Sequence, residues 1–319
     1  MIKQFLSVPP LLVKGAKFVA GSQAKISEQS LQQIALRLRK RTLTMCAKAG
    51  TGHLTSSYSC IEILTALYHG GILRHDPACP DWSDRDRFIL SKGQASPALY
   101  AVLADRGYFP DEWLDGFAQV GGRMGVHLQQ SIPGAEITCG SLGQGFGLAV
   151  GMALAAKMDG KGHRIFTMLG DGECWEGAVW EAAAFAAHHR LNNLVAIIDR
   201  NQMSVMGKTE EIVALEPLAV KWRAWGWDVS QWGGHDDPDI PRHPWDHEDP
   251  RSLSGHRFDD LFWAFKNLMR DNTLTFDRPK VIIAETIKGK GIPEIEGQAL
   301  WHGVAPKGEE VARFQEVLS

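Results

Sequence analysis

Hydrophobic and polar positions along this chain follow two different periods. From residue 26 to residue 49, apolar side chains recur every three or four positions with Arg and Lys on the opposite face, which predicts an amphipathic helix. Continuous apolar runs instead predict strands that are buried on both faces. Such runs lie at residues 164–169, 194–198, 227–232 and 280–285. Because helical segments separate these runs, we expect an α/β fold with a doubly wound, mostly parallel sheet flanked by helices.

Shorter elements complete the predicted order. A short strand is expected over residues 84–90, and helices are expected over residues 57–69, 96–105, 111–118 and 140–157. The last of these helices is unusual because it contains four glycines, at positions 143, 145, 147 and 151. A glycine costs a helix about 1 kcal/mol relative to alanine. Four of them indicate that the backbone closely approaches another helix or a ligand.

We expect one folded domain, over residues 26–319, with two additions. Residues 1–25 are expected to form an N-terminal arm, whose apolar run is interrupted by Pro9-Pro10 and so differs from a signal peptide. Residues 238–255 are rich in Pro, Asp, His and Arg, which predicts a solvated loop insertion. Three histidines occur in or beside this insertion without the spacing of a metal site, namely His243, His247 and His256.

Composition narrows the class of protein. The chain has 319 residues, of which 44% are hydrophobic and 22% are charged, as in ordinary globular proteins. Its net charge of -3 gives no reason to expect nucleic acid or anionic membranes as partners. Its five cysteines form no CxxC pair, which favours free thiols in a reducing compartment. No apolar stretch approaches the roughly 20 residues that span a membrane. We therefore expect a cytoplasmic protein with no nucleic-acid or membrane partner.

Polar residues that suit a metal follow two of the predicted strands. Gly170-Asp171-Gly172 comes directly after the run at 164–169, and Asn201 follows the run at 194–198. Ligands of such sheets bind beyond the carboxyl ends of the strands. Carboxylate and amide oxygens suit Mg²⁺, which typically also takes diphosphate oxygens. The spacing predicts a metal–diphosphate anchor, although Gly-Asp-Gly by itself is also typical of a tight turn.

Two histidines in predicted loops are candidates for proton transfer. His53 and His127 each follow glycines, at Gly50-Thr51-Gly52 and at Gly125, which would bring the imidazoles close to a ligand. Neutral imidazole suits proton shuttling, or hydrogen bonding to hydroxyls, near pH 7. A single histidine in a loop is more often a surface residue, so the two gain weight only beside the metal–diphosphate anchor.

These motifs together resemble the thiamine diphosphate-binding N-terminal part of transketolase, over about residues 30–310. The resemblance implies thiamine diphosphate and Mg²⁺ as cofactors, with the metal bound by Asp171, the Asn201 side chain and the Met203 backbone carbonyl. It also implies that His53 and His127 are catalytic, with His127 bonding the C1 hydroxyl of the donor sugar. The residues that it assigns to the cofactor are Gln94, Gly140, Ser141, Leu142, Gly170, Gly172, Glu173, Asn201 and Lys288.

Three further segments match this family. The loop at 140–145 resembles the one that holds the aminopyrimidine ring through backbone groups of Gly140 and Leu142. Glu176 matches a glutamate used in communication across the dimer. The segment 286–291 matches a late loop over the diphosphate, in which Lys288 or Lys290 either supplies a cation or is simply solvated.

Two departures from the family pattern affect the expected chemistry. Gln94 stands where the family has a histidine, and glutamine can donate a hydrogen bond but does not titrate near neutral pH. We therefore expect an altered substrate preference or attenuated proton transfer, with cofactor binding kept. The late loop also lacks the family's usual histidine at residues 291–294, and His302 is a candidate replacement.

The resemblance also implies a partner. In the family, a glutamate that activates the cofactor comes from a C-terminal pyrimidine-binding domain of the opposite subunit, and this chain ends at Ser319, where that domain would begin. We therefore expect the N-terminal subunit of a split transketolase, in a heterotetramer with two copies of each chain. The helix at 140–157 would lie at the interface, where assembly would cover its apolar residues Leu148, Val150 and Leu154.

The expected activity is the transfer of a two-carbon ketol unit from a ketose, expected to be a sugar phosphate, to an aldose. One alternative is another thiamine diphosphate enzyme subunit, similar to deoxyxylulose phosphate synthase or to a 2-oxoacid dehydrogenase. Another is a non-catalytic partner subunit. His53, His127 and the loop at 140–145 favour transketolase over the dehydrogenase. The intact metal motif opposes the non-catalytic alternative, which Gln94 slightly favours.

Overall fold

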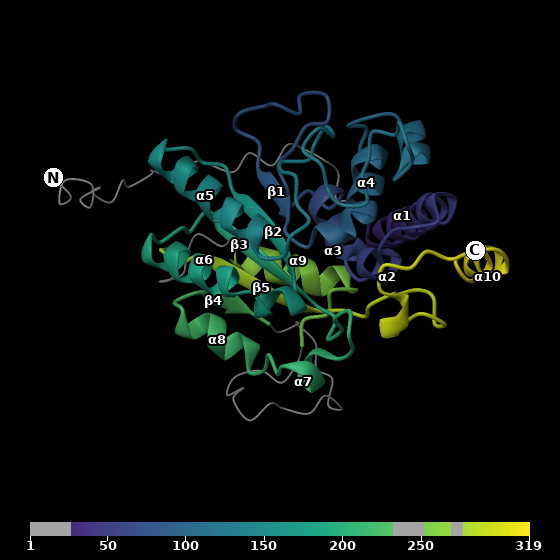
Figure 1. Cartoon of the computed structure of the whole chain (residues 1–319). Coiled ribbons are helices and arrows are strands. Elements are labelled where there is room, and N and C mark those ends of the chain that lie inside the picture. The colour runs from purple at the N-terminus through teal and green to yellow at the C-terminus, as the bar shows by residue number, and fades with distance from the viewer. Residues whose placement is uncertain (1–26, 232–251, 269–276) are drawn as a thin grey trace.

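A five-stranded sheet forms the centre of the computed structural model, which describes residues 27–231, 252–268 and 277–319. The strand order is β1-β2-β3-β5-β4 (Figure 1), and every neighbouring pair is parallel. The strands are β1 (Arg87–Leu90), β2 (Ile165–Gly170), β3 (Leu194–Arg200), β4 (Asp228–Ser230) and β5 (Lys280–Glu285). The predicted α/β fold is confirmed. The arm expected at residues 1–25 lies outside the described residues.

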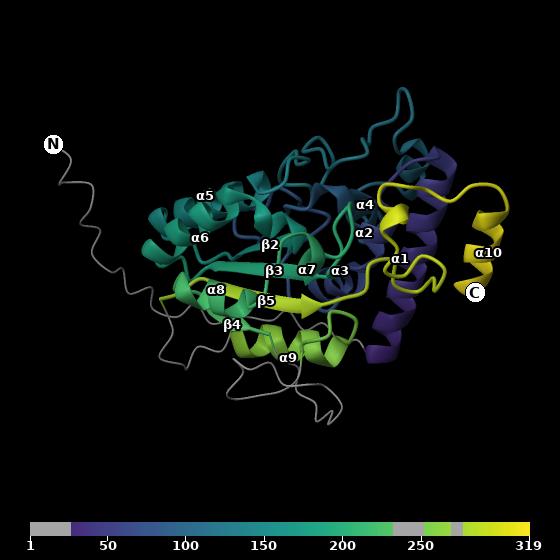
Figure 2. The same cartoon turned by 60° about the horizontal axis from the view of Figure 1, so that its bottom comes forward.

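Helices cover both faces of this sheet. In Figure 2, α5 and α6 lie on one side of the strands and α9 lies on the other. The α-helices are α1 (Glu28–Ala49), α2 (Leu54–Tyr58), α3 (Ile61–Tyr68), α4 (Ser96–Asp105), α5 (Gln144–Met158), α6 (Gly177–His188), α7 (Thr209–Ile212), α8 (Leu218–Ala224), α9 (Phe258–Leu268) and α10 (Glu309–Val317). Short 3₁₀ helices are η1 (Gly93–Ala95), η2 (Asp111–Gly116), η3 (Gly172–Trp175) and η4 (Ala299–Trp301).

The sheet separates two hydrophobic cores. Successive side chains of a strand point to opposite faces. In β3, Val195 and Ile197 therefore pack into the core that also holds residues of α1, α3, α4 and α9. Ala196 and Ile198 pack into the core that holds residues of α5, α6 and α8. Apolar residues are needed on both faces, which explains why these strands appear in the sequence as unbroken apolar runs.

The first helix follows its prediction, and the second does not. In α1 the Ser27 side chain accepts a hydrogen bond from the Ser30 N–H, and Gly50, at φ 66°, ends the helix in the left-handed region. The single helix predicted over 57–69 is wrong in its bounds, because α2 begins earlier and a break separates it from α3. At the break, the Ser59 hydroxyl donates to the buried carboxylate of Asp199.

Two other predicted helices also differ from the structure. Residues 111–116 form a 3₁₀ helix instead of an α-helix. The glycine-rich helix begins only at Gln144, because Gly143 adopts φ +78° and residues 140–143 form a loop. Close approach is confirmed at Gly145, where a Cβ atom would lie 2.7 Å from the Cα of Ser91. Gly147 and Gly151 instead face open space in this chain.

The predicted insertion extends too far toward the C-terminus. Residues 238–251 lie outside the described residues, but residues 252–255 run alongside β5. The Glu285 N–H donates to the Leu253 carbonyl, and the Gly255 N–H donates to the Glu285 carbonyl. Leu253 is buried in the first core, so this stretch belongs to the fold and not to a solvated loop.

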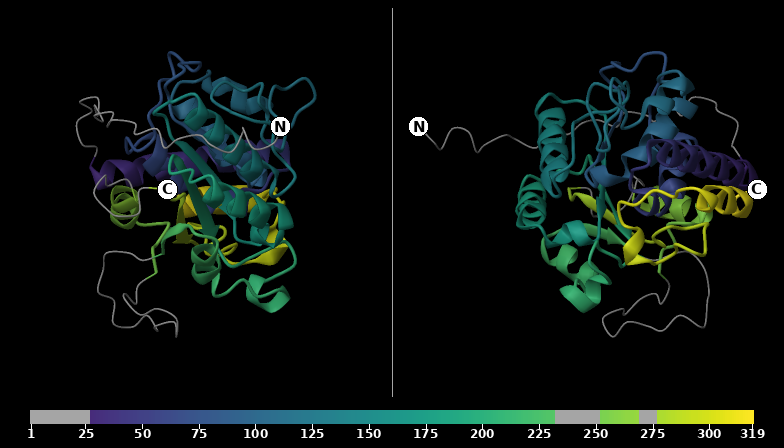
Figure 3. Two further views of the ribbon diagram at one scale, coloured as in Figure 1. Left: turned by 90° about the vertical axis from the view of Figure 1, so that its left-hand side faces the viewer. Right: turned by 45° about the vertical axis from the view of Figure 1, so that its right-hand side comes forward.

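The C-terminal helix packs far from α5 and α6. Helix α10 lies beside α1, on the opposite side of the molecule from α5 and α6 (Figures 1 and 3). Its Phe314 enters the first core and contacts Trp301, with ring centroids 5.4 Å apart. Within the described ranges, no helix has the length and apolar character that crossing a membrane requires.

Candidate active site

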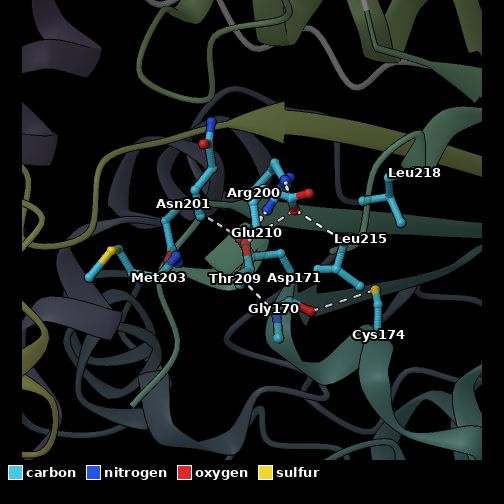
Figure 4. Close-up of polar contacts among 12 residues, drawn as sticks. Gly170, Asp171, Cys174, Arg200, Asn201, Met203, Thr209, Glu210, Leu215 and Leu218 are labelled. Atoms are coloured by element: carbon cyan, nitrogen blue, oxygen red, sulfur yellow. Dashed lines mark hydrogen bonds and ion pairs between the residues drawn. The ribbon is translucent and has the colours of Figure 1, made fainter. Parts of the chain in front are cut away.

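The two strand-end motifs lie side by side, as the sequence predicts. Gly170 of β2 is in register with Asp199 of β3, so Asp171 and Asn201 leave adjacent strands at the same edge. Asp171 is buried, and its Oδ1 accepts a hydrogen bond from the Gly172 N–H at 2.8 Å. Burial raises the pKa of the Asp171 carboxyl, although the neighbouring Arg200 guanidinium opposes this shift (Figure 4).

The other two predicted metal ligands follow on the same loop. Asn201 Oδ1 accepts from the Met203 N–H at 3.0 Å, which closes a tight turn. The Met203 carbonyl accepts from Lys288 Nζ at 3.3 Å. The set therefore combines one carboxylate, one amide oxygen and one backbone carbonyl, which are donors that Mg²⁺ prefers. A metal site made of three or more His, Cys, Asp or Glu side chains is a different kind of site. The described residues contain no such group.

Lys288 occupies a buried position above this loop. It is 2% exposed, so a solvated lysine, one of the two expectations for this residue, is wrong. Its Nζ also donates to the Ser204 carbonyl at 3.0 Å and lies 2.8 Å from His302 Nδ1. Burial lowers the pKa of Lys288 to about 8, and the nearby Lys92 ammonium contributes. Lys288 thus connects the predicted metal loop to a histidine.

Three imidazoles lie near one another, and one of them, that of His302, contacts Lys288. The ring centroid of His53 lies 5.7 Å from that of His127 and 5.3 Å from that of His302. Burial lowers the pKa of both His53 and His302 to about 4, so both are neutral at pH 7. His53 Nδ1 is buried and has no hydrogen-bond partner among the described residues. The structure therefore brings the two predicted histidines together and adds His302, the weaker candidate.

The loop at 140–143 is held by two of the predicted cofactor residues. Gln94 Nε2 donates to the Gly140 carbonyl at 3.2 Å. Glu173 is buried and accepts from the Gly143 N–H at 2.8 Å, from the Gly170 N–H at 3.1 Å and from the Ser91 hydroxyl. Burial raises the pKa of Glu173. Both residues therefore anchor the loop through protein contacts, while its Ser141 is exposed and its Leu142 is half-buried.

A buried ion pair beneath the site was not predicted. Asp199, fully buried in β3, is paired with Lys92, which is also buried. Asp199 also accepts from the hydroxyls of Ser59 and Thr286. Although burial opposes ionisation, the Lys92 ammonium and these donors hold the pKa of Asp199 below its ordinary value. The available signal was an aspartate in a strand buried on both faces, because such a charge needs a partner.

The remaining candidates have other surroundings. His256 Nδ1 lies 3.0 Å from a carboxylate oxygen of Glu62, and its Nε2 accepts from the Ile287 N–H. His243 and His247 lie outside the described residues. Glu176 is exposed and precedes α6, and its Cβ is 3.1 Å from the point where Gly143 would carry a Cβ.

A model of a known protein family matches the part of the chain that holds most of these elements. A family model described as transketolase, thiamine diphosphate binding domain, matches residues 30–242, which include the strand-end motifs, the loop at 140–143 and the histidines at 53 and 127. The chain belongs to the transketolase family. The resemblance stated from the motifs is therefore confirmed, and His302 and Lys288 lie beyond the matched residues.

Relatives of this transketolase-family chain include proteins named as subunits. It is 42% identical over 282 residues to the 6-deoxy-6-sulfo-D-fructose transketolase subunit SqwG of Clostridium sp. (strain MSTE9), covering 88% of this chain and 93% of that protein. It is 36% identical to a protein of Phocaeicola vulgatus that is named as a subunit of apulose-4-phosphate transketolase, covering 88% and 91% respectively. Both matches therefore extend over nearly the whole of those subunits.

A solved structure supports the same fold. The transketolase of Campylobacter jejuni superposes with a TM-score of 0.79 and 31% sequence identity. The match covers 92% of this chain but 43% of the Campylobacter chain. This chain therefore spans less than half the length of that transketolase.

Proposed function

We propose that this chain is the diphosphate-binding subunit of a two-chain transketolase, which transfers a two-carbon ketol unit from a ketose to an aldose. The observation that carries the proposal is the cluster of His53, His127 and His302, joined through Lys288 to the Met203 carbonyl. Acid–base groups and the predicted metal loop thus meet at one edge of the sheet. The names of the two subunit relatives support the two-chain organisation.

The proposed cofactors are thiamine diphosphate and Mg²⁺. Asp171, Asn201 and the Met203 carbonyl would hold the metal, since their oxygens match its chemistry. The residues proposed for the diphosphate are Gly170, Gly172, Asn201 and Lys288. Those proposed for the aminopyrimidine end are Gly140, Ser141 and Leu142, with Gln94 and Glu173 holding their loop.

The mechanism assigns separate tasks to cofactor and protein. Bound thiamine diphosphate supplies an electron sink for the carbon–carbon cleavage. His53, which is neutral at pH 7, is suited to accept a proton from a substrate hydroxyl. Because Lys288 donates to His302 Nδ1, the proton of neutral His302 lies on Nε2, where it is available as a donor. His127, whose side chain is exposed in the single chain, is proposed to bond the sugar.

Replacing His53 with alanine is expected to lower kcat/KM by about 100-fold in the assembled enzyme. This is the lower end of the usual range, because His127 and His302 remain beside the site. Retention of thiamine diphosphate should not change, since His53 is not a proposed ligand of the diphosphate or the metal. Steady-state kinetics and cofactor quantification would test this. His188→Ala, at the C-terminal end of α6, is the control, and equal kinetics for the two variants would contradict the role of His53.

The proposed assembly is a heterotetramer with two copies of this chain and two of a subunit that carries the pyrimidine-binding domain and its catalytic glutamate. Gly147, Leu148 and Gly151 are exposed along α5, which supports an interface on that helix. The expectation that Val150 is covered only on assembly is wrong, because it is already 4% exposed in the single chain. A cytoplasmic location is proposed from the five free cysteines.

The two-chain proposal predicts that the isolated chain does not catalyse ketol transfer. Activity should appear when the chain is co-expressed with the product of the adjacent reading frame and supplied with Mg²⁺ and thiamine diphosphate. Donors would include xylulose 5-phosphate, apulose 4-phosphate and 6-deoxy-6-sulfofructose, with product detected by mass spectrometry. Ketol transfer by the chain alone would contradict the two-chain proposal. Absence of cofactor uptake by the purified pair would favour a non-catalytic subunit.

A further inference from the structure

A buried guanidinium lies directly behind the proposed metal site. Arg200 ends β3 and its side chain is 3% exposed. One terminal nitrogen donates to Asp171 Oδ2 at 3.0 Å and to the Thr209 hydroxyl at 2.8 Å. The other donates to Glu210 at 2.7 Å and to Glu216 at 3.0 Å. Figure 4 shows Arg200 close to both Asp171 and Glu210.

On one side, the hydrogen bond that Arg200 donates fixes the direction of the Asp171 carboxylate. Oδ2 receives Arg200 and the Gln202 N–H, at 3.0 and 2.5 Å, while Oδ1 receives the Gly172 N–H. Donors on both oxygens set the plane of the carboxylate. A charged donor such as Arg contributes more to this than a neutral one.

On the other side, Arg200 orders the segment that follows Asn201. Glu210 accepts from Arg200 and also from the backbone N–H groups of Leu215 and Glu216. Glu216 in turn accepts from the Leu218 N–H. One side chain thereby ties the loop that follows Met203 to the end of β2, where Asp171 lies.

The local charge balance remains negative around this cation. One guanidinium faces three carboxylates, those of Asp171, Glu210 and Glu216. Arg200 and its three carboxylate partners therefore keep a net negative charge beside the proposed metal site, although the Lys288 ammonium lies against the Met203 carbonyl. Groups behind a ligand that orient it typically change metal affinity about 10- to 100-fold when they are removed.

We propose that Arg200 is a positioning residue that sets the metal affinity of this subunit by orienting Asp171 and the Asn201–Met203 loop. This inference rests on the proposed role of those residues in binding Mg²⁺. Arg200 would not contact the substrate or the cofactor. Its removal should therefore change the Mg²⁺ requirement for cofactor binding, and not only the stability of the fold.

The test is a Mg²⁺ titration, at saturating thiamine diphosphate, of the complex that this chain forms with its partner subunit. Bound cofactor is measured by equilibrium dialysis, independently of activity. In Arg200→Met, the Mg²⁺ concentration for half-maximal binding should rise about 10- to 100-fold. The Mg²⁺ concentration for Arg200→Lys should lie between those of the unaltered complex and Arg200→Met. Lysine keeps the charge but lacks the planar guanidinium that reaches carboxylates on both sides. Arg190→Met is the matched control, since Arg190 precedes the amino end of β3, is 67% exposed and pairs at the surface with Asp277.

An unchanged or lower Mg²⁺ requirement in Arg200→Met would overturn the inference, and a lower one would mean that Arg200 competes with the metal. If Arg200→Met does not fold, Glu216→Gln takes its place, because it weakens the hold on Arg200 without touching Asp171. Glu216→Gln should raise the Mg²⁺ requirement several-fold, and an unchanged requirement would overturn the inference. Absence of thiamine diphosphate binding by the unaltered complex would instead contradict the proposed function.

Discussion

Replacing Asp171 with alanine is expected to abolish Mg²⁺-dependent retention of thiamine diphosphate, because the affinity for Mg²⁺ should fall by about 100-fold or more. Asp171 is the one carboxylate in the proposed ligand set, and the other two ligands are neutral oxygens of Asn201 and Met203. Loss of its charge removes most of the attraction for a divalent cation. The measurement is bound cofactor per complex after dialysis across a range of Mg²⁺ concentrations.

The fold should survive this substitution. Arg200 keeps Glu210 and Glu216 as partners, so its guanidinium is not left unpaired. Loss of the Asp171 cap on η3 costs about 1 kcal/mol. Asp171→Asn is the matched variant, because it keeps an oxygen acceptor for the Gly172 N–H while it removes the charge and the acceptor for Arg200 and the Gln202 N–H. Both variants should lose the cofactor while keeping native circular dichroism. Unchanged retention in either variant would remove Asp171 from the metal site.

The second large effect concerns stability. Asp199→Ala is expected to lower the free energy of unfolding by about 3–5 kcal/mol, because it leaves the buried Lys92 ammonium without its carboxylate. Urea unfolding followed by fluorescence would measure the shift in midpoint. Asp277→Ala removes an exposed partner from a surface pair with Arg190 and should cost about 1 kcal/mol or less. Similar midpoints for the two variants would contradict the importance of the buried pair.

The same ion pair predicts a pH dependence. The pKa of Asp199 is lower in the folded chain than its ordinary value of 3.8. Its contribution to stability is therefore present above the pKa of the unfolded chain and is lost as the pH falls through the folded value. The difference in stability between the native chain and Asp199→Ala should shrink below about pH 4.

A variant with both Lys92→Met and Asp199→Leu should be more stable than Asp199→Ala alone, since no charge is left unpaired.

The fold could be predicted where burial alone determines the residue pattern. Strands β2, β3 and β5 are apolar on both faces and were recognised from their continuous runs. The start of α5 was misjudged because Gly143 and Gly145 look alike in the sequence. In the structure, Gly143 takes a left-handed conformation outside the helix, and Gly145 packs against Ser91 inside it.

The candidate site was only partly accessible from the sequence. Asp171 and Asn201 could be placed together because parallel strands bring their carboxyl ends to one edge. Lys92 and Asp199 are 107 residues apart, and no local pattern indicates that they pair. Arg200 raised the same difficulty, because its partners depend on how the loop after Asn201 folds back. Local motifs therefore revealed the proposed ligands but not the charged residues that hold them.

The three contacts of Glu173 have a consequence for the thermodynamics of binding. Its carboxylate receives N–H groups from Gly143 and Gly170 and a hydroxyl from Ser91, so one side chain joins the loop at 140–143 to the end of β2. The two segments proposed to contact opposite ends of the cofactor are thus connected through one buried side chain. A ligand entering between them does not have to order each loop separately, and the entropic penalty of association falls accordingly. Such a site selects ligands by the fixed span between these two segments.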